Sequence, residues 1–114
     1  TKNTKEERKY TDKDIEKLKN KLDCILKELI EETNLIPNKV RIRNINYAWG
    51  SCSSNKNITI NLKLVDKQDI EIKYVVLHEL CHLKYMNHSK KFWNLVEKYM
   101  PEYKEVRKKL KYNR

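Results

Sequence analysis

Two histidines four residues apart, His78 and His82, stand in the stretch YVVLHELCHLKYMNH that runs from Tyr74 to His88. On an α-helix, side chains at this spacing lie on one face with Cβ atoms about 5–6 Å apart, so both imidazoles can bind one metal ion. Glu79 is turned about 100° around the helix axis from His78, where its carboxylate can act on a water molecule beside the metal. The pattern is the His-Glu-x-x-His of zinc hydrolases, and it predicts a zinc site with Glu79 as the general base.

The helix that would carry these residues is predicted over residues 69–85 and is apolar on nearly every side. At about 100° per residue, one stripe of it contains Glu71, Val75, His78 and His82. A helix of this kind belongs in the core of a small domain. Two histidines buried there need a partner to offset their desolvation, and a metal ion would supply it. Cys81 lies about 100° from the stripe and is expected to be a core residue.

The predicted third ligand is His88, the remaining histidine of the chain. A continuing helix, which rises about 1.5 Å per residue, would carry it too far from His82. The chain must therefore leave the helix near Tyr85 to Asn87 and fold back, and Asn87 tolerates the left-handed backbone angles of such a turn. Metzincins share the His-x3-His-x5-His spacing but have glycine where this chain has Tyr85, which indicates a different turn.

A catalytic zinc site normally has three protein ligands and one water molecule, so the identity of the third ligand matters. The main alternative to His88 is a carboxylate from the helices that follow it, which contain Glu97, Glu102 and Glu105. No surrounding motif favours any of the three. Tyr74 and Tyr85 are candidate donors of a hydrogen bond to an oxyanion.

The chain is strongly basic, with 26 lysines and arginines against 16 acidic residues and a net charge of +10. This charge permits attraction to nucleic acid or another polyanion. Lysines spread over exposed helix faces explain it equally well. The densest basic cluster lies at the C-terminal end of the last predicted helix, where cations also complement the helix dipole, and comprises Lys104, Arg107, Lys108, Lys109, Lys111 and Arg114.

The three cysteines, Cys24, Cys52 and Cys81, are odd in number and form no C-x-x-C pair, which argues against a disulfide framework and for a reducing compartment. We therefore expect a cytoplasmic protein. No stretch has the roughly 18 apolar residues of a membrane span, and no signal-peptide pattern opens the chain. Because its first residue is Thr1 rather than Met, we expect a fragment or a processed form. Residues 1–114 are expected to form one domain, and the sequence says nothing about its oligomeric state.

Helical periodicity is clearest in the first third of the chain. Residues 1–10 are charged and are expected to fray or extend a helix. Thr11 and Asp14 have the spacing of a capping box, and apolar residues then recur at helical spacing to about Thr33. Asn34 and Pro37 are expected to end this helix.

The period changes to two between Val40 and Val65. Alternation through Val40 and Ile42, and in the opposite phase through residues 45–49, suggests strands with a break near Asn44. Ile58, Ile60, Leu62 and Leu64 alternate in turn. The turn-rich segment 50–57 between these runs predicts a β-hairpin or meander, with Trp49 and Gly50 at its tip or bend.

Two further helices are predicted after the metal site. Asp66 or Asp69 is a candidate cap for the metal-binding helix, and Ser89 is a good N-cap for the next one. Pro101 is expected to separate that helix from a last one that turns Tyr103, Val106 and Leu110 inward. The predicted fold is α+β, with a small, mostly antiparallel sheet packed against a long N-terminal helix, the metal-binding helix and C-terminal helices.

Several separated motifs occur in one order between Val40 and Leu110: Trp49-Gly50-Ser51-Cys52, Asn61 with Leu64, Tyr74 to His82, Asn87-His88-Ser89, Phe92-Trp93 and Pro101. In these motifs the chain resembles the YgjP-like metal-dependent hydrolases, relatives of the SprT and WLM zincin-like metallopeptidases. The resemblance implies a zincin-like fold, zinc bound by His78, His82 and His88, and Glu79 as catalytic acid and base. Members of this family are usually longer, so we expect residues 1–114 to be a part that does not include the family's β-rich N-terminal region.

The resemblance leaves the substrate open. Peptide bonds are the first expectation, and an alternative is a nucleoside-triphosphate pyrophosphatase that uses the same metal. Another alternative, suggested by SprT, is a protease or binding module that associates with nucleic acid through its basic surface. Cys52 of the Trp-Gly-Ser-Cys motif could pack, act as a switch, or be a fourth ligand that makes the metal purely structural. An edge strand between Val40 and Val65 could bind an extended substrate by strand addition.

Overall fold

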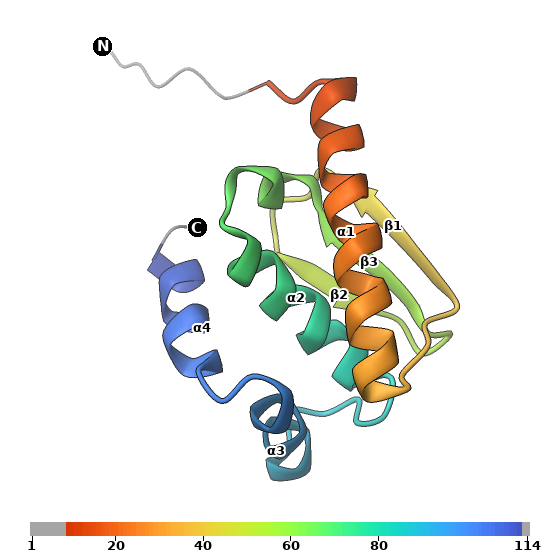
Figure 1. Cartoon of the computed structure of the whole chain (residues 1–114), viewed down its shortest axis with the longest axis vertical. Coiled ribbons are helices and arrows are strands. Elements are labelled where there is room, and N and C mark those ends of the chain that lie inside the picture. Colours follow the sequence, from red (N-terminus) through yellow and green to blue (C-terminus); the bar gives the residue numbers. More distant parts are fainter. Residues whose placement is uncertain (1–8, 113–114) are drawn as a thin grey trace.

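The computed structural model describes residues 9–112 and shows an α+β fold with four α-helices and a three-stranded sheet (Figure 1). The elements in chain order are α1 (Asp12–Thr33), β1 (Lys39–Arg43), β2 (Gly50–Cys52), β3 (Asn57–Asn61), the 3-10 helix η1 (Leu62–Asp66), α2 (Asp69–His82), α3 (Lys90–Tyr99) and α4 (Tyr103–Tyr112). The α+β class predicted from the sequence is confirmed. Of the residues expected to fray, 1–8 lie outside the described part of the chain.

Helix α1 begins and ends where the sequence predicts. The Thr11 amide donates to the Asp14 carboxylate at 2.9 Å, and the Asp14 amide donates to the Thr11 hydroxyl at 3.4 Å. This capping box satisfies two amides that the first turn leaves without helical partners. Asn34 follows the last turn with a left-handed φ of 60°. The buried leucines of this helix, Leu18, Leu22 and Leu29, face the core and each contribute about 1.5–3 kcal/mol.

The sheet is mixed, with strand order β1-β3-β2, and this corrects the prediction of a mostly antiparallel sheet. Strands β2 and β3 form an antiparallel hairpin, but β2 lies within the segment 50–57 that was predicted as the turn, so Gly50 begins a strand instead of forming the tip. Strand β1 pairs parallel with β3. The hairpin partner already occupies one edge of β3, so β1 can only take the other. The alternation that predicted a strand to Leu64 instead continues, after Asn61, into η1.

The strand predicted over residues 45–49 is wrong, because this segment is a loop between β1 and β2. Buried Asn61 holds the loop in place: its amide nitrogen donates to the carbonyls of Ile45 at 3.0 Å and Ala48 at 2.8 Å. These bonds satisfy carbonyls that a strand ladder would otherwise have paired. The loop leads directly into β2, so Asn61 also sets where Gly50 lies.

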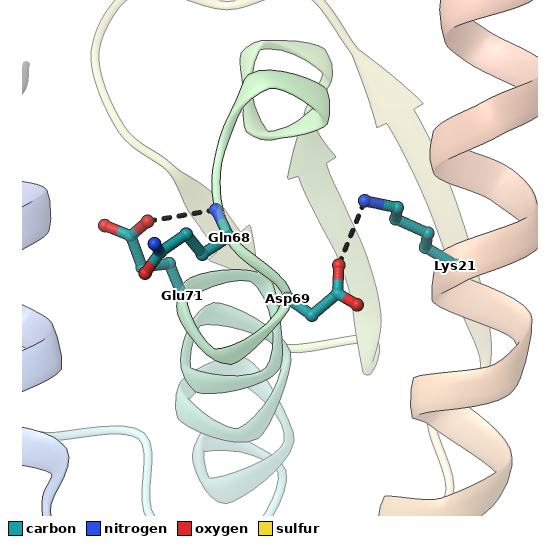
Figure 2. A network of polar contacts seen from close by, with 4 residues as sticks. All are labelled: Lys21, Gln68, Asp69 and Glu71. Carbon is teal, nitrogen blue, oxygen red and sulfur yellow. Dashed lines mark hydrogen bonds and ion pairs between the residues drawn. The ribbon is translucent and has the colours of Figure 1, made fainter.

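Helix α2 is the central element and lies between α1 and α4 (Figure 1). It also packs against β2, β3 and α3, and its apolar side chains fill the core as predicted, Cys81 among them. Its N-cap is Gln68 rather than Asp66 or Asp69. The amide of Gln68 donates to the Glu71 carboxylate at 3.0 Å, and Asp69 pairs with Lys21 of α1 at 2.9 Å (Figure 2).

The last two helices, α3 and α4, both pack against α2. The Ser89 hydroxyl accepts from the amide of Phe92 at 3.4 Å, which confirms Ser89 as the cap of α3. Pro101 lies in the turn between α3 and α4. The predicted inward residues of α4, Tyr103, Val106 and Leu110, are buried. Within the described residues, no helix is both long and apolar enough to cross a membrane.

Candidate metal centre

The three histidines meet at the C-terminal end of α2. His78 and His82 come from successive turns of this helix, which ends at His82, and residues 83–88 then bring His88 back over them. The Nε2 atom of His88 lies 3.2 Å from Nε2 of His78 and 3.2 Å from Nε2 of His82. Among residues 9–112, this is the one group of three or more histidine, cysteine or acidic side chains whose ligand atoms converge in this way.

These distances fit a metal ion bound by nitrogen. Zinc lies about 2.0–2.1 Å from histidine nitrogen in tetrahedral sites, which places two such nitrogens about 3.3 Å apart. A single hydrogen between two rings could join only one pair of the three nitrogens, whereas one cation can accept a lone pair from each. The cluster is buried at His82 and exposed at His88, so one side of it is open to solvent.

In two of the rings, Nδ1 points away from the cluster and has a partner, which orients the ring so that Nε2 faces the cluster. Nδ1 of His82 lies 3.0 Å from the carbonyl oxygen of Tyr85, which can only accept, so Nδ1 carries the hydrogen. Nδ1 of His78 lies 3.3 Å from the hydroxyl of Tyr74. Such outer partners orient metal-binding imidazoles and fix their tautomer. Of the two tyrosines predicted as oxyanion donors, Tyr74 thus contacts His78, and Tyr85 contributes its backbone carbonyl to His82.

The histidines of α2 are held in the neutral form that a metal ligand requires. Burial is the main cause that lowers the pKa of His78 to about 3, and the neighbouring His82 and His88 add to it. Burial also lowers the pKa of His82, although its hydrogen bond to the Tyr85 carbonyl acts in the opposite direction. At neutral pH both rings therefore offer a lone pair.

Two aromatic residues of α3 support the rings, and sequence reasoning gave them no role at the site. Phe92 is fully buried and stacks on His82, with centroids 4.5 Å apart and an angle of 27° between the planes. It also meets His78 and His88 edge to face. Trp93 stacks on His88 at 5.7 Å. The adjacent Phe-Trp pair in the sequence was the available signal, since it follows His88 closely.

Glu79 lies beside the histidines and is only 5% exposed. Burial raises the pKa of its carboxyl group to about 8. A bound divalent cation nearby would lower this value again, because an opposite charge favours the carboxylate. Glu79 and His78 line one cavity of about 360 Å³, together with Ala48, Trp49, Gly50, Tyr74, Val75, Arg107 and Leu110.

Gly50 allows β2 to lie against the helix at this point. A Cβ atom at Gly50 would come within 3.0 Å of Val75 Cγ1 and 3.2 Å of Glu79 Oε2. We expect Gly50→Ala to destabilise the fold by about 1–3 kcal/mol, as overpacking does. Urea unfolding measures this, with Ser51→Ala in the same strand as the control. Equal stability of the two variants would mean that β2 can move away from α2 without cost.

The alternative ligands considered from the sequence lie outside the cluster. Glu97, Glu102 and Glu105 are all exposed and are not among the converging groups of the described chain. Cys52 is also outside it, and its thiol lies 3.6 Å from the Ser53 carbonyl. Burial, and then the charge of Glu79, raises the pKa of Cys52 to about 11. The metal-binding thiolate form is therefore disfavoured.

Comparison with known proteins agrees with this geometry. A family model described as YgjP-like, metallopeptidase domain, matches residues 1–113. The metallopeptidase zymogen abylysin of Pyrococcus abyssi is similar in structure, with a TM-score of 0.71 and 28% identity over 78% of this chain and 90% of its own. The zymogen jannalysin of Methanocaldococcus jannaschii gives a TM-score of 0.70 and 25% identity over 81% and 95%. No curated protein matches significantly.

Proposed function

The chain belongs to the YgjP-like metallopeptidase domain family, and from this premise we propose that it is a zinc-dependent peptidase with Glu79 as its catalytic acid and base. In this proposal His78, His82 and His88 are the metal ligands. The observation that carries it is the convergence of three imidazole nitrogens beside a buried carboxyl group. Three nitrogen ligands leave one of the four positions of zinc open.

The roles of the protein groups follow from their chemistry. Zinc at this site would supply a Lewis acid that polarises a peptide carbonyl and lowers the pKa of water to about 7. The Glu79 carboxylate accepts a proton from the attacking water and passes it to the leaving nitrogen. A group that performs both proton transfers needs a pKa near the working pH. Burial raises the pKa of Glu79 above its usual value and so brings it closer to neutral pH. Tyr74 and the Tyr85 carbonyl keep two of the rings aligned.

The sheet offers a place for the peptide chain. Strand β2 is an edge strand, since the order is β1-β3-β2. It lies against α2 at Gly50, next to Glu79. An extended peptide that pairs with the outer edge of β2 would add a strand to the sheet and run past the histidines. Its main-chain hydrogen bonds would orient the scissile carbonyl.

The test combines metal binding with two substrate panels. We expect the metal-free chain to take up one equivalent of zinc, and the zinc-loaded chain to cleave members of a peptide library and lose this activity with a chelator. A panel of nucleoside triphosphates is assayed in parallel. Pyrophosphate release from nucleotides without peptide cleavage would overturn the peptidase proposal in favour of the pyrophosphatase alternative, and failure to bind zinc would remove both.

A further inference from the structure

Arg107 is a positively charged residue in the wall of the cavity that contains His78 and Glu79. It comes from α4, and its guanidinium carbon lies 4.8 Å from the centre of the Trp93 ring. Trp93 in turn stacks on His88 and on Tyr103. A guanidinium held over an aromatic ring has fewer orientations than a free one. Arg107 is itself exposed, and the stack favours positions of its charge in the wall of this cavity.

The guanidinium has unused hydrogen-bonding capacity. Among residues 9–110, whose side chains the structure describes, no hydrogen bond or carboxylate at ion-pair distance is found for Arg107, and its guanidinium lies over the ring of Trp93. Its N–H donors form a planar fork that matches a carboxylate in a bidentate pair. A cation on the wall of a partly apolar cavity also attracts anions more strongly than one on an open surface.

We propose that Arg107 binds a carboxylate of the substrate and gives the enzyme a preference for acidic peptides. The inference rests on the proposed peptidase function and specifies its substrate class. The carboxylate belongs either to an Asp or Glu side chain near the scissile bond or to the C-terminus of the peptide. Both present the same group to Arg107. The cavity, at about 360 Å³, has the size of a small ligand pocket.

The first experiment compares the turnover of four peptides. They have either Glu or Gln beside the cleaved bond, each combined with either a free or an amidated C-terminus. We expect kcat/KM of the zinc-loaded chain to favour one acidic form by roughly 10- to 100-fold, the value of a charge-assisted hydrogen bond. The pair that shows the preference identifies the source of the carboxylate. Arg107→Gln should remove the preference mainly through KM, so that this variant has equal kcat/KM for the acidic and the neutral peptide.

Two variants separate a specific contact from general charge. Lys108→Gln removes the same charge from the next residue of α4, which is exposed and does not line the cavity, so the acidic preference should remain. Arg107→Lys keeps the charge but loses the planar fork, so a smaller preference should remain. An equal loss in Arg107→Gln and Lys108→Gln would overturn the proposal, because the effect would then be long-range attraction.

The second experiment needs no turnover. Trp93 and Trp49 both lie at the site, so tryptophan fluorescence of the metal-free chain can report binding of acetylated glutamic acid and acetylated glutamine. We expect the acid to bind more tightly than the amide, and Arg107→Gln to abolish the difference. Equal binding by the native chain would refute the carboxylate site even if peptides are cleaved. An Arg107-dependent preference without any peptide cleavage would keep the site and refute the peptidase function.

Discussion

Replacing Glu79 by Gln is expected to lower kcat by about 10²- to 10⁴-fold, the usual contribution of a general acid and base. Gln has the same shape as Glu but cannot accept the proton of water. The three histidines are unchanged, so the variant should still bind one equivalent of zinc. Turnover is measured on the best peptide of the library, and bound zinc by direct metal analysis of the same sample.

The matched control for this variant is Glu97→Gln. Glu97 is exposed on α3 and lies outside the ligand cluster, so its replacement should change neither zinc content nor kcat. Loss of zinc from Glu97→Gln would show that a carboxylate is the third ligand after all. Retained turnover in Glu79→Gln would assign the proton transfers to another group.

Removal of His88 is expected to lower metal affinity strongly. His88→Ala leaves two of the three ligand nitrogens. Loss of a residue that only hydrogen-bonds to a ligand lowers metal affinity by roughly 10- to 100-fold, and we expect the loss of His88 to lower zinc affinity by more than this. His88 is exposed and comes from a loop, so the metal-free fold should keep its stability. Competition with a chromophoric zinc chelator measures the affinity, and thermal unfolding of the metal-free protein measures the stability.

Two variants define the scale for this result. Tyr74→Phe removes only the hydroxyl that lies 3.3 Å from Nδ1 of His78, so its effect should stay within the range for an outer partner. Met86→Ala changes an exposed side chain in the same loop and should bind zinc normally. A His88→Ala variant that binds zinc as tightly as Tyr74→Phe would remove His88 from the ligand set.

The elements that could be predicted from the sequence are those with local causes. The capping box of Thr11 and Asp14 and the cap at Ser89 act over three residues, and the structure shows both. The burial of α2 follows from its apolar residues on nearly every side. The spacing of His78 and His82 needs nothing beyond the geometry of one helix.

The errors arose where a distant residue decides the local structure. Alternation over residues 45–49 resembles a strand, but the side chain of Asn61, from another element, takes the carbonyls of Ile45 and Ala48 and keeps the segment a loop. The place of β1 beside β3 likewise depends on β2 having taken the other edge of β3. Periodicity along one strand carries no information on either point.

The sequence by itself determined which donor atoms the site has: three imidazoles, two of them one helical turn apart, and a carboxylate next to the first. Only the tertiary structure decided that His88 returns to within 3.2 Å of both rings, that Phe92 and Trp93 support them, and that Arg107 shares their cavity. The reason is that spacing within a helix follows from covalent geometry. The approach of α3, α4 and β2 to α2 depends instead on how all their apolar faces pack into one core.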